Sequence, residues 1–130
     1  MVQPAAGDSA EVEIIVGPAH TADAMGNPGV TVYATPQVVA LMETAGHRVI
    51  LPHLPAGAGT VGTMVEMRHL AATPVGMKVR ARATVLESDG RRVLFAVEAW
   101  DERGKIAEGR HERVVVGDLA RFLARAAGKA

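Results

Sequence analysis

The chain has 130 residues, the size of one ordinary domain, and 48% of them are hydrophobic while 22% are charged. Fourteen Lys and Arg balance fourteen Asp and Glu, so the sequence has no basic excess of the kind that marks a nucleic-acid-binding protein. It contains no Cys, which excludes disulfides, thiolate zinc sites and a cysteine nucleophile. No stretch approaches the ~18 apolar residues of a membrane helix, and the N-terminal segment lacks the features of a secretory signal. We therefore expect a cytoplasmic protein without nucleic-acid or membrane partners.

The N-terminal quarter predicts one strand and a long loop. Residues 1–9 are small and polar with Pro and Gly, which predicts a flexible leader ahead of a single domain over residues 10–130. Residues 11–16 (EVEIIV) alternate loosely and predict a strand. Residues 17–33 are rich in Gly, Pro and Asn and predict a loop with at most one short helical turn.

Thr35-Pro36 is the clearest start signal for a helix. Thr is a favoured N-cap, and Pro suits the first helical position because its missing N–H would be unpaired there in any case. The residues that follow keep a broad apolar surface, and Pro52 predicts the end of the helix. Glu43 is the only interruption of that surface in the middle of the helix.

The second half of the chain predicts an antiparallel meander of four strands, over residues 60–69, 78–88, 91–101 and 105–116. The separators TPVG, Asp89-Gly90 and Arg103-Gly104 all have turn chemistry. Residues 118–127 then predict a short amphipathic helix.

One long helix among antiparallel strands predicts an α+β fold in which the helix packs on one face of the sheet. The hotdog fold, a long central helix wrapped by a curved antiparallel sheet, is one option among several on this pattern alone. A ferredoxin-like fold would need a second long helix between strands, and the sequence has none.

Three residue types along this order can carry chemistry. Glu43 would be either a desolvated carboxylate, able to attack or to act as general base, or a solvated residue on the exposed edge of the helix. His69 could act as acid or base near neutral pH, or be structural. Thr35 could cap the helix, act in catalysis, or both. No HxH, HExxH, GxSxG or P-loop pattern occurs, so a metal site, a classical serine hydrolase and a nucleotide hydrolase are not expected.

Thr35 and Glu43 are eight residues apart, about 12 Å along a helix at 1.5 Å per residue. They cannot hydrogen-bond to each other within one straight helix. Either the chain bends back at the helix start, or a partner subunit completes the set.

Three segments, ATPQVVALMETA, TVGTMVEMRHLAATPVG and GRHER, together resemble the fluoroacetyl-CoA thioesterase-like family, in order and at matching separations. The resemblance implies a hotdog fold and the hydrolysis of acyl-CoA thioesters. It also implies a catalytic set of Thr35, Glu43 and His69. By the same resemblance, a backbone N–H at Gly62 would help to hold the thioester carbonyl, and Arg113 would be a basic residue near the active site.

The resemblance further implies a homodimer or higher homo-oligomer with active sites at the subunit interface. CoA would be part of the acyl-CoA substrate, and no separate cofactor is expected. Residues 17–33 match the family poorly and contain no Phe, so a preference for fluoroacetyl-CoA is not implied. Two alternatives stay open: a hotdog enoyl-CoA hydratase or dehydratase, and a non-catalytic acyl-CoA binding module.

Overall fold

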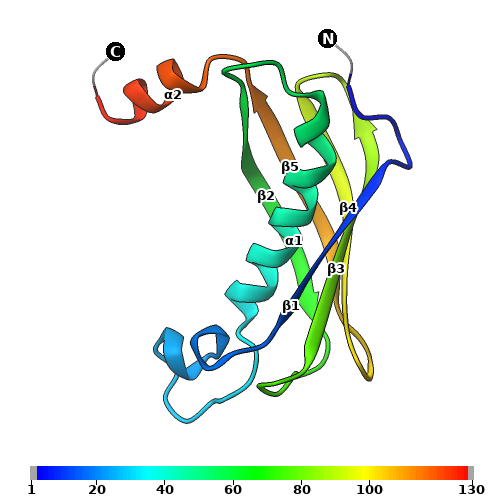
Figure 1. Ribbon diagram of the computed structural model, residues 1–130, viewed down its shortest axis with the longest axis vertical. Helices are drawn as coiled ribbons and strands as arrows, with labels where there is room; N and C mark the ends of the chain where they lie inside the picture. Colours follow the sequence, from blue (N-terminus) through cyan, green and yellow to red (C-terminus); the bar gives the residue numbers. More distant parts are fainter. Residues whose placement is uncertain (1–2, 129–130) are drawn as a thin grey trace.

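The computed structural model in Figure 1 describes residues 3–128 as one long helix against a five-stranded sheet, with a short helix at the C-terminal end. The strands are β1 (Ser9–Ile15), β2 (Gly59–His69), β3 (Lys78–Ser88), β4 (Arg92–Asp101) and β5 (Gly104–Val116). The helices are α1 (Thr35–Ile50) and α2 (Leu119–Ala126), and single 3-10 turns occupy Pro18–His20, Asp23–Met25 and Leu51–His53. This arrangement confirms the predicted α+β hotdog fold.

All neighbouring strands are antiparallel, in the order β1-β3-β4-β5-β2. The predicted four-stranded meander is therefore wrong, because only β3, β4 and β5 follow one another through tight turns. β2 instead lies at one edge of the sheet, where it pairs with β5, and the segment that follows β2 crosses to β3 near the other edge. Its turn residues instead contact the long loop, through a bridge between Pro74 and Val32 and a hydrogen bond from Gly76 N to Val16 O (2.7 Å).

The core lies between α1 and the sheet. One face of β3 is buried over Val79, Ala81, Ala83 and Val85, and the small Ala81 and Ala83 let the helix approach closely. α1 packs against all five strands and contributes Val38, Leu41, Met42, Ala45, Val49 and Ile50 to the core. Burial of each large side chain is worth about 1.5–3 kcal/mol, so this face fixes the rotation of the helix. The other side of α1 therefore faces outward.

The last residues of the predicted leader contact β3. Gly7 N donates a hydrogen bond to Val85 O, and Val85 N donates one to Asp8 O. The division into a leader and one domain stays a prediction. No helix among residues 3–128 is long and apolar enough to span a membrane.

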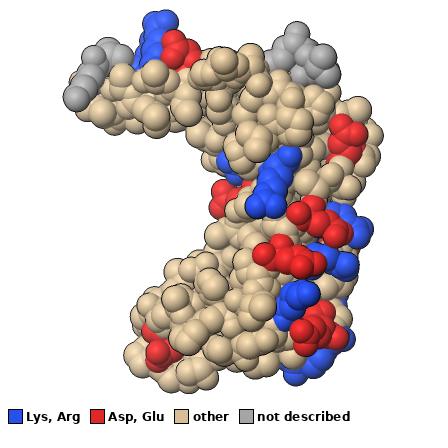
Figure 2. Space-filling view, in the orientation of Figure 1, with Lys and Arg blue, Asp and Glu red and all other residues tan. Residues whose placement is uncertain are grey.

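One side of the molecule is hollowed. Figure 2 shows this side between α2 at one end and the loop around residues 17–33 at the other. α2 begins after Asp118, whose side chain accepts a hydrogen bond from Arg121 N (3.0 Å), and none of its residues is buried. β2 forms the edge of the sheet on this side, with β5 as its one strand partner in the part of the chain that the structure describes.

Candidate active site

A hydroxyl–imidazole pair lies at the start of α1. Thr35 Oγ1 is 2.8 Å from His69 Nδ1, although the two residues are 34 positions apart. His69 is the last residue of β2, and a hydrogen bond from Tyr33 N to Thr73 O (2.8 Å) ties the segment after β2 to the segment before α1. The ends of the two elements therefore meet.

Thr35 does not cap the helix, so that interpretation of the Thr-Pro signal is wrong. The N-cap is Ala34, whose side chain offers no hydrogen bond, and Thr35 is already the first helical residue. Pro36 is tolerated one position later because the N–H groups of the first turn have no intrahelical partner. The Thr35 hydroxyl is thus free to bond to His69.

His69 is present as a neutral imidazole. Burial lowers the pKa of His69 below its usual 6.5, so the imidazole is neutral at neutral pH. Its Nε2 is buried and has no hydrogen-bond partner among residues 3–128. A neutral imidazole beside a hydroxyl can act as a general base toward that hydroxyl or toward a water.

The Thr35–His69 pair opens onto a pocket of about 350 Å³. Most of its walls are small or aliphatic, from the loop before α1 and from the residues after β2. The lining residues are Ala22, Asn27, Val30, Val32, Tyr33, Ala34, Leu70, Ala71 and Ala72. The Tyr33 ring is 1% exposed, and its hydroxyl donates to Gln37 O (3.2 Å). This pocket has room for a small apolar group beside the hydroxyl and the imidazole.

Glu43 lies two turns further along α1, in a second pocket that it shares with Thr60 and Arg113. Its Oε2 is 3.6 Å from Arg113 NH1, and its side chain is 39% exposed within one protomer. The sequence left open whether Glu43 is desolvated or lies on the exposed edge of the helix, and within one protomer it lies on the exposed edge. The reason is that the apolar face of α1 turns toward the sheet and leaves Glu43 at its margin.

Gly62 lies directly against the Glu43 carboxylate. A Cβ at this position would be 2.7 Å from Glu43 Oε2, so no side chain fits without displacing the carboxylate. The register between β2 and β5 shifts between Gly62 and Met64, which marks a β-bulge at this point. Gly62 therefore belongs to the Glu43 pocket and not to the Thr35–His69 pair.

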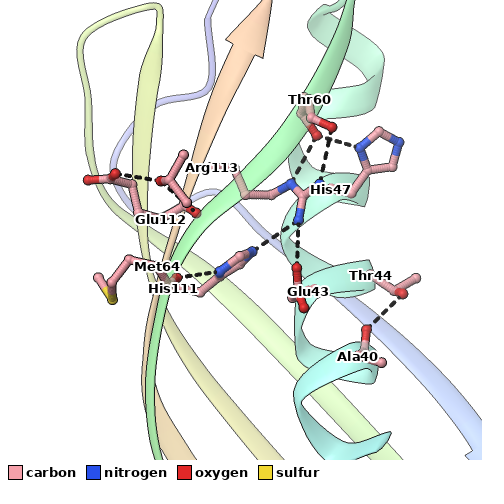
Figure 3. Close-up of polar contacts among 10 residues, drawn as sticks. Ala40, Glu43, Thr44, His47, Thr60, Met64, His111, Glu112 and Arg113 are labelled. Atoms are coloured by element: carbon pink, nitrogen blue, oxygen red, sulfur yellow. Dashed lines mark hydrogen bonds and ion pairs between the residues drawn. The ribbon is translucent and has the colours of Figure 1, made fainter. Parts of the chain in front are cut away.

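Arg113 is 8% exposed and is fixed by neighbours on two sides (Figure 3). Its Nε donates to Thr60 Oγ1 (2.9 Å), its NH2 to Thr60 O (3.3 Å) and its NH1 to His111 Nε2 (3.1 Å). Burial lowers the pKa of Arg113, but a guanidinium remains charged at any ordinary pH. Arg113 therefore presents a fixed positive charge to Glu43.

Sequence reasoning missed His111, Thr60 and His47 as members of this cluster. His47 Nδ1 is 2.7 Å from Thr60 Oγ1, and His111 is completely buried with its Nδ1 2.9 Å from Met64 O. One signal was available, because His111 and Arg113 are two apart on a strand and therefore share a face.

The sequence-predicted residues thus fall into two groups within one protomer. Thr35 and His69 are together at the start of α1, and Glu43, Gly62 and Arg113 are together near its middle. Both groups lie along the outward side of α1. Residues 3–128 contain no group of three His, Asp or Glu side chains that could hold a metal ion.

Comparisons with known proteins agree over most of the chain. The family described as fluoroacetyl-CoA-specific thioesterase (FlK) matches residues 16–118. A fluoroacetyl-CoA thioesterase from Streptantibioticus cattleyicolor is 40% identical over 94 residues, which are 72% of this chain and 67% of that protein. A solved structure of a Phe-to-Ala mutant of FlK has a TM-score of 0.91 at 32% identity over 100% of both chains, and another FlK mutant is known in complex with acetyl-CoA. A hypothetical protein of the thioesterase superfamily from Thermus thermophilus has a TM-score of 0.88 at 38% identity, covering 99% of this chain and 96% of that chain.

Proposed function

Because the chain belongs to the family of fluoroacetyl-CoA-specific thioesterases and is a thioester hydrolase, we propose that it hydrolyses an acyl-CoA to the free acid and CoA. The observation that carries this proposal is the pair of Thr35 and His69, 2.8 Å apart at the mouth of an aliphatic pocket. A hydrocarbon acyl group suits that pocket. Apart from Thr35, His69 and the buried Tyr33, the one polar side chain in its lining is Asn27.

The active form is a homodimer, and each site combines Thr35 and His69 of one protomer with Glu43, Gly62 and Arg113 of its partner. Thr35 and Glu43 are about 12 Å apart along one continuous helix, too far for both to act on one carbonyl within a protomer. In a two-fold dimer each protomer offers both groups, so two complete sites form at once.

The exposed edge of β2 supplies a way to bring the groups together. Unpaired edge strands are normally covered or paired, and the two-fold partner of an edge strand is the same strand running antiparallel. Gly62 and His69 lie toward opposite ends of β2. An antiparallel pairing centred on Glu66, in which Glu66 lies opposite its own copy, brings the bulge that begins at Gly62 of one protomer opposite the partner's His69. That register joins the Glu43 pocket of one protomer to the Thr35–His69 pair of the other.

Hydrolysis in such a site needs an oxygen nucleophile and donors for the carbonyl oxygen. Either the Glu43 carboxylate attacks the thioester carbon and water then cleaves the anhydride, or Glu43 takes a proton from a water that attacks directly. In both routes the C–S bond breaks and the thiolate leaves as CoA. The Gly62 N–H is the donor to the carbonyl oxygen, and the Thr35 hydroxyl, bonded to His69 Nδ1, passes protons between the reacting groups and the imidazole.

A thiol-release assay over short, branched and aromatic acyl-CoAs tests the reaction. We expect stoichiometric CoA release with at least one member of the panel. An enoyl-CoA whose absorbance changes without release of thiol would identify a hydratase. Tight binding without any turnover would identify an acyl-CoA binding module. Either result would overturn the proposal.

Light scattering at micromolar protein tests the assembly. We expect at least twice the 13.6 kDa of the chain. A monomer that retains full activity would exclude both the dimer and the shared site.

A further inference from the structure

The structure contains a buried imidazole to which the proposed reaction assigns no role. His111 is 0% exposed and lies on β5, two residues before Arg113 on the same face of the strand. We propose that His111 is a positioning residue, whose neutral ring, fixed between Met64 O and the Arg113 guanidinium, directs Arg113 NH1 toward Glu43. This inference rests on the proposed function, because it gives His111 a role only if Glu43 acts in catalysis.

The hydrogen bonds of His111 permit one protonation state. A backbone carbonyl can only accept, so the contact of Nδ1 with Met64 O (2.9 Å) requires a proton on Nδ1. A guanidinium can only donate, so the contact of Nε2 with Arg113 NH1 (3.1 Å) requires a free lone pair on Nε2. The ring is therefore neutral with its proton on Nδ1. A second proton, on Nε2, would place an N–H of His111 against an N–H of Arg113 and would bring two positive charges together.

The surroundings of the ring favour the same state. Burial lowers the pKa of His111, and the positive charge of Arg113 acts in the same direction, while Glu43 on α1 and Glu112 on β5 oppose it. His47, which also faces Arg113 from α1, has its pKa lowered by burial and by that same guanidinium. The Arg113 guanidinium is therefore the charged group between the neutral imidazoles of His47 and His111.

Close packing holds the His111 ring in this orientation. A Cβ at Gly46 of α1 would be 3.0 Å from His111 Cδ2, and one at Gly62 of β2 would be 3.2 Å from His111 Cε1. The Phe95 ring stacks on the imidazole, with centroids 6.0 Å apart and planes inclined by 21°. The imidazole is therefore packed against Gly46, Gly62 and the Phe95 ring, which together restrict its rotation.

The consequence for Glu43 follows from the geometry of Arg113. Thr60 holds the Nε and NH2 side of the guanidinium, and His111 holds NH1 from the side opposite Thr60 (Figure 3). NH1 is also the atom nearest Glu43, at 3.6 Å. Without an acceptor at position 111, NH1 keeps a buried N–H without a partner, and the guanidinium must turn to find one.

Three variants test this role in the full-length protein, each measured per folded molecule. His111→Leu removes the acceptor, His111→Gln keeps an oxygen that can accept from Arg113, and Val97→Ala is a control for loss of core packing without a polar contact. We expect His111→Leu to lower kcat by roughly 10²-fold with little change in KM, because a misplaced catalytic group costs about that much. His111→Gln should stay within about tenfold of wild type, because the acceptor is kept. Val97→Ala should keep wild-type kcat.

A ¹⁵N–¹H NMR experiment on the wild-type protein tests the tautomer without any substitution, and so does not depend on whether His111→Leu folds. We expect a proton on Nδ1 and none on Nε2 of His111 over about pH 6–8, the range in which an ordinary His titrates. A proton on Nε2, a wild-type kcat in His111→Leu, or a Gln variant as slow as the Leu variant would each overturn the role.

Glu43→Gln is measured alongside as the test of the underlying function. If the wild type releases no thiol, or Glu43→Gln is fully active, the proposed function fails. If both of those results are as expected and His111→Leu keeps wild-type kcat, only the positioning role fails.

Discussion

Replacing Gly62 with Ala should move the Glu43 carboxylate without harming the fold. The added Cβ would be 2.7 Å from Glu43 Oε2, 3.2 Å from His111 Cε1 and 3.4 Å from Arg113 NH1. An ordinary contact begins near 3.4 Å, so the carboxylate must retreat by about 0.7 Å. The carboxylate is the far end of a side chain that is 39% exposed, so it has space to move outward.

The expected cost to catalysis follows from that displacement. A shift of about 1 Å in a reacting group can cost roughly 10²-fold, so we expect kcat of Gly62→Ala to fall by about 10–10²-fold. Stability should change little, because Ala restricts the unfolded chain at a position without positive φ, while its Cβ presses on the buried His111 ring at 3.2 Å.

Steady-state thiol release and thermal unfolding check both halves of this expectation. Gly117→Ala is the matched control, because a Cβ there has nothing within 4 Å and its φ is also not positive. The Gly62→Ala variant keeps the backbone N–H at this position, so any loss reports on displaced side chains of the Glu43 pocket and not on a missing donor. A Gly62→Ala enzyme with wild-type kcat would refute the account of the Glu43 pocket.

Three further outcomes are expected. Glu43→Gln should abolish turnover while circular dichroism stays native, and near-wild-type hydrolysis would remove Glu43 from the mechanism. His69→Ala should lower kcat by roughly 10²–10⁴-fold, with a smaller effect on KM. Its kcat/KM profile should also lack an ionisation that the wild type shows below pH 6.5, since burial lowers the pKa of His69. An unchanged kcat and pH profile per folded molecule would mean that His69 is only structural. The free energy of unfolding should be greatest above pH 6.5 and fall as the pH drops, because the lowered pKa values of His47, His69 and His111 mean that the unfolded state binds more protons there. Urea titrations from pH 7.5 to pH 5 should show a shallower fall in His111→Gln than in wild type, and equal slopes would contradict the titration of His111 on unfolding.

The limits of the helices and strands were accessible from the sequence because local chemistry sets them. Asp89-Gly90 gives the turn before β4, where Gly90 has φ +89°, and Arg103-Gly104 gives the turn before β5, where Gly104 has φ +144°. β3 was predicted over its observed range, and the other predicted strands of the second half begin within one residue of the observed ones. The pairing of β2 was not accessible, because a period of two tells which face of a strand is buried and not which strand lies beside it.

The site was accessible in its residues and not in its contacts. The resemblance pointed to Thr35 and His69, but the capping rule is local, whereas the observed partner of the Thr35 hydroxyl is 34 residues away. Glu43 was noticed as a carboxylate on an apolar helix, yet its exposure depends on the exact rotation of α1 against the sheet. His111 gave little signal because burial of a neutral imidazole depends on glycines in two other elements, Gly46 and Gly62.

The shared active site is tested most directly by mixing two inactive variants, His69→Ala and Glu43→Gln, after unfolding and refolding them together. If each site takes Thr35 and His69 from one protomer and Glu43 from the other, half of the dimers are mixed and each of these has one intact site. An equimolar mixture should then recover about a quarter of wild-type activity. If all three residues act within one protomer, every site keeps one lesion. A mixture as inactive as its two components, although mixed dimers form, would contradict the account.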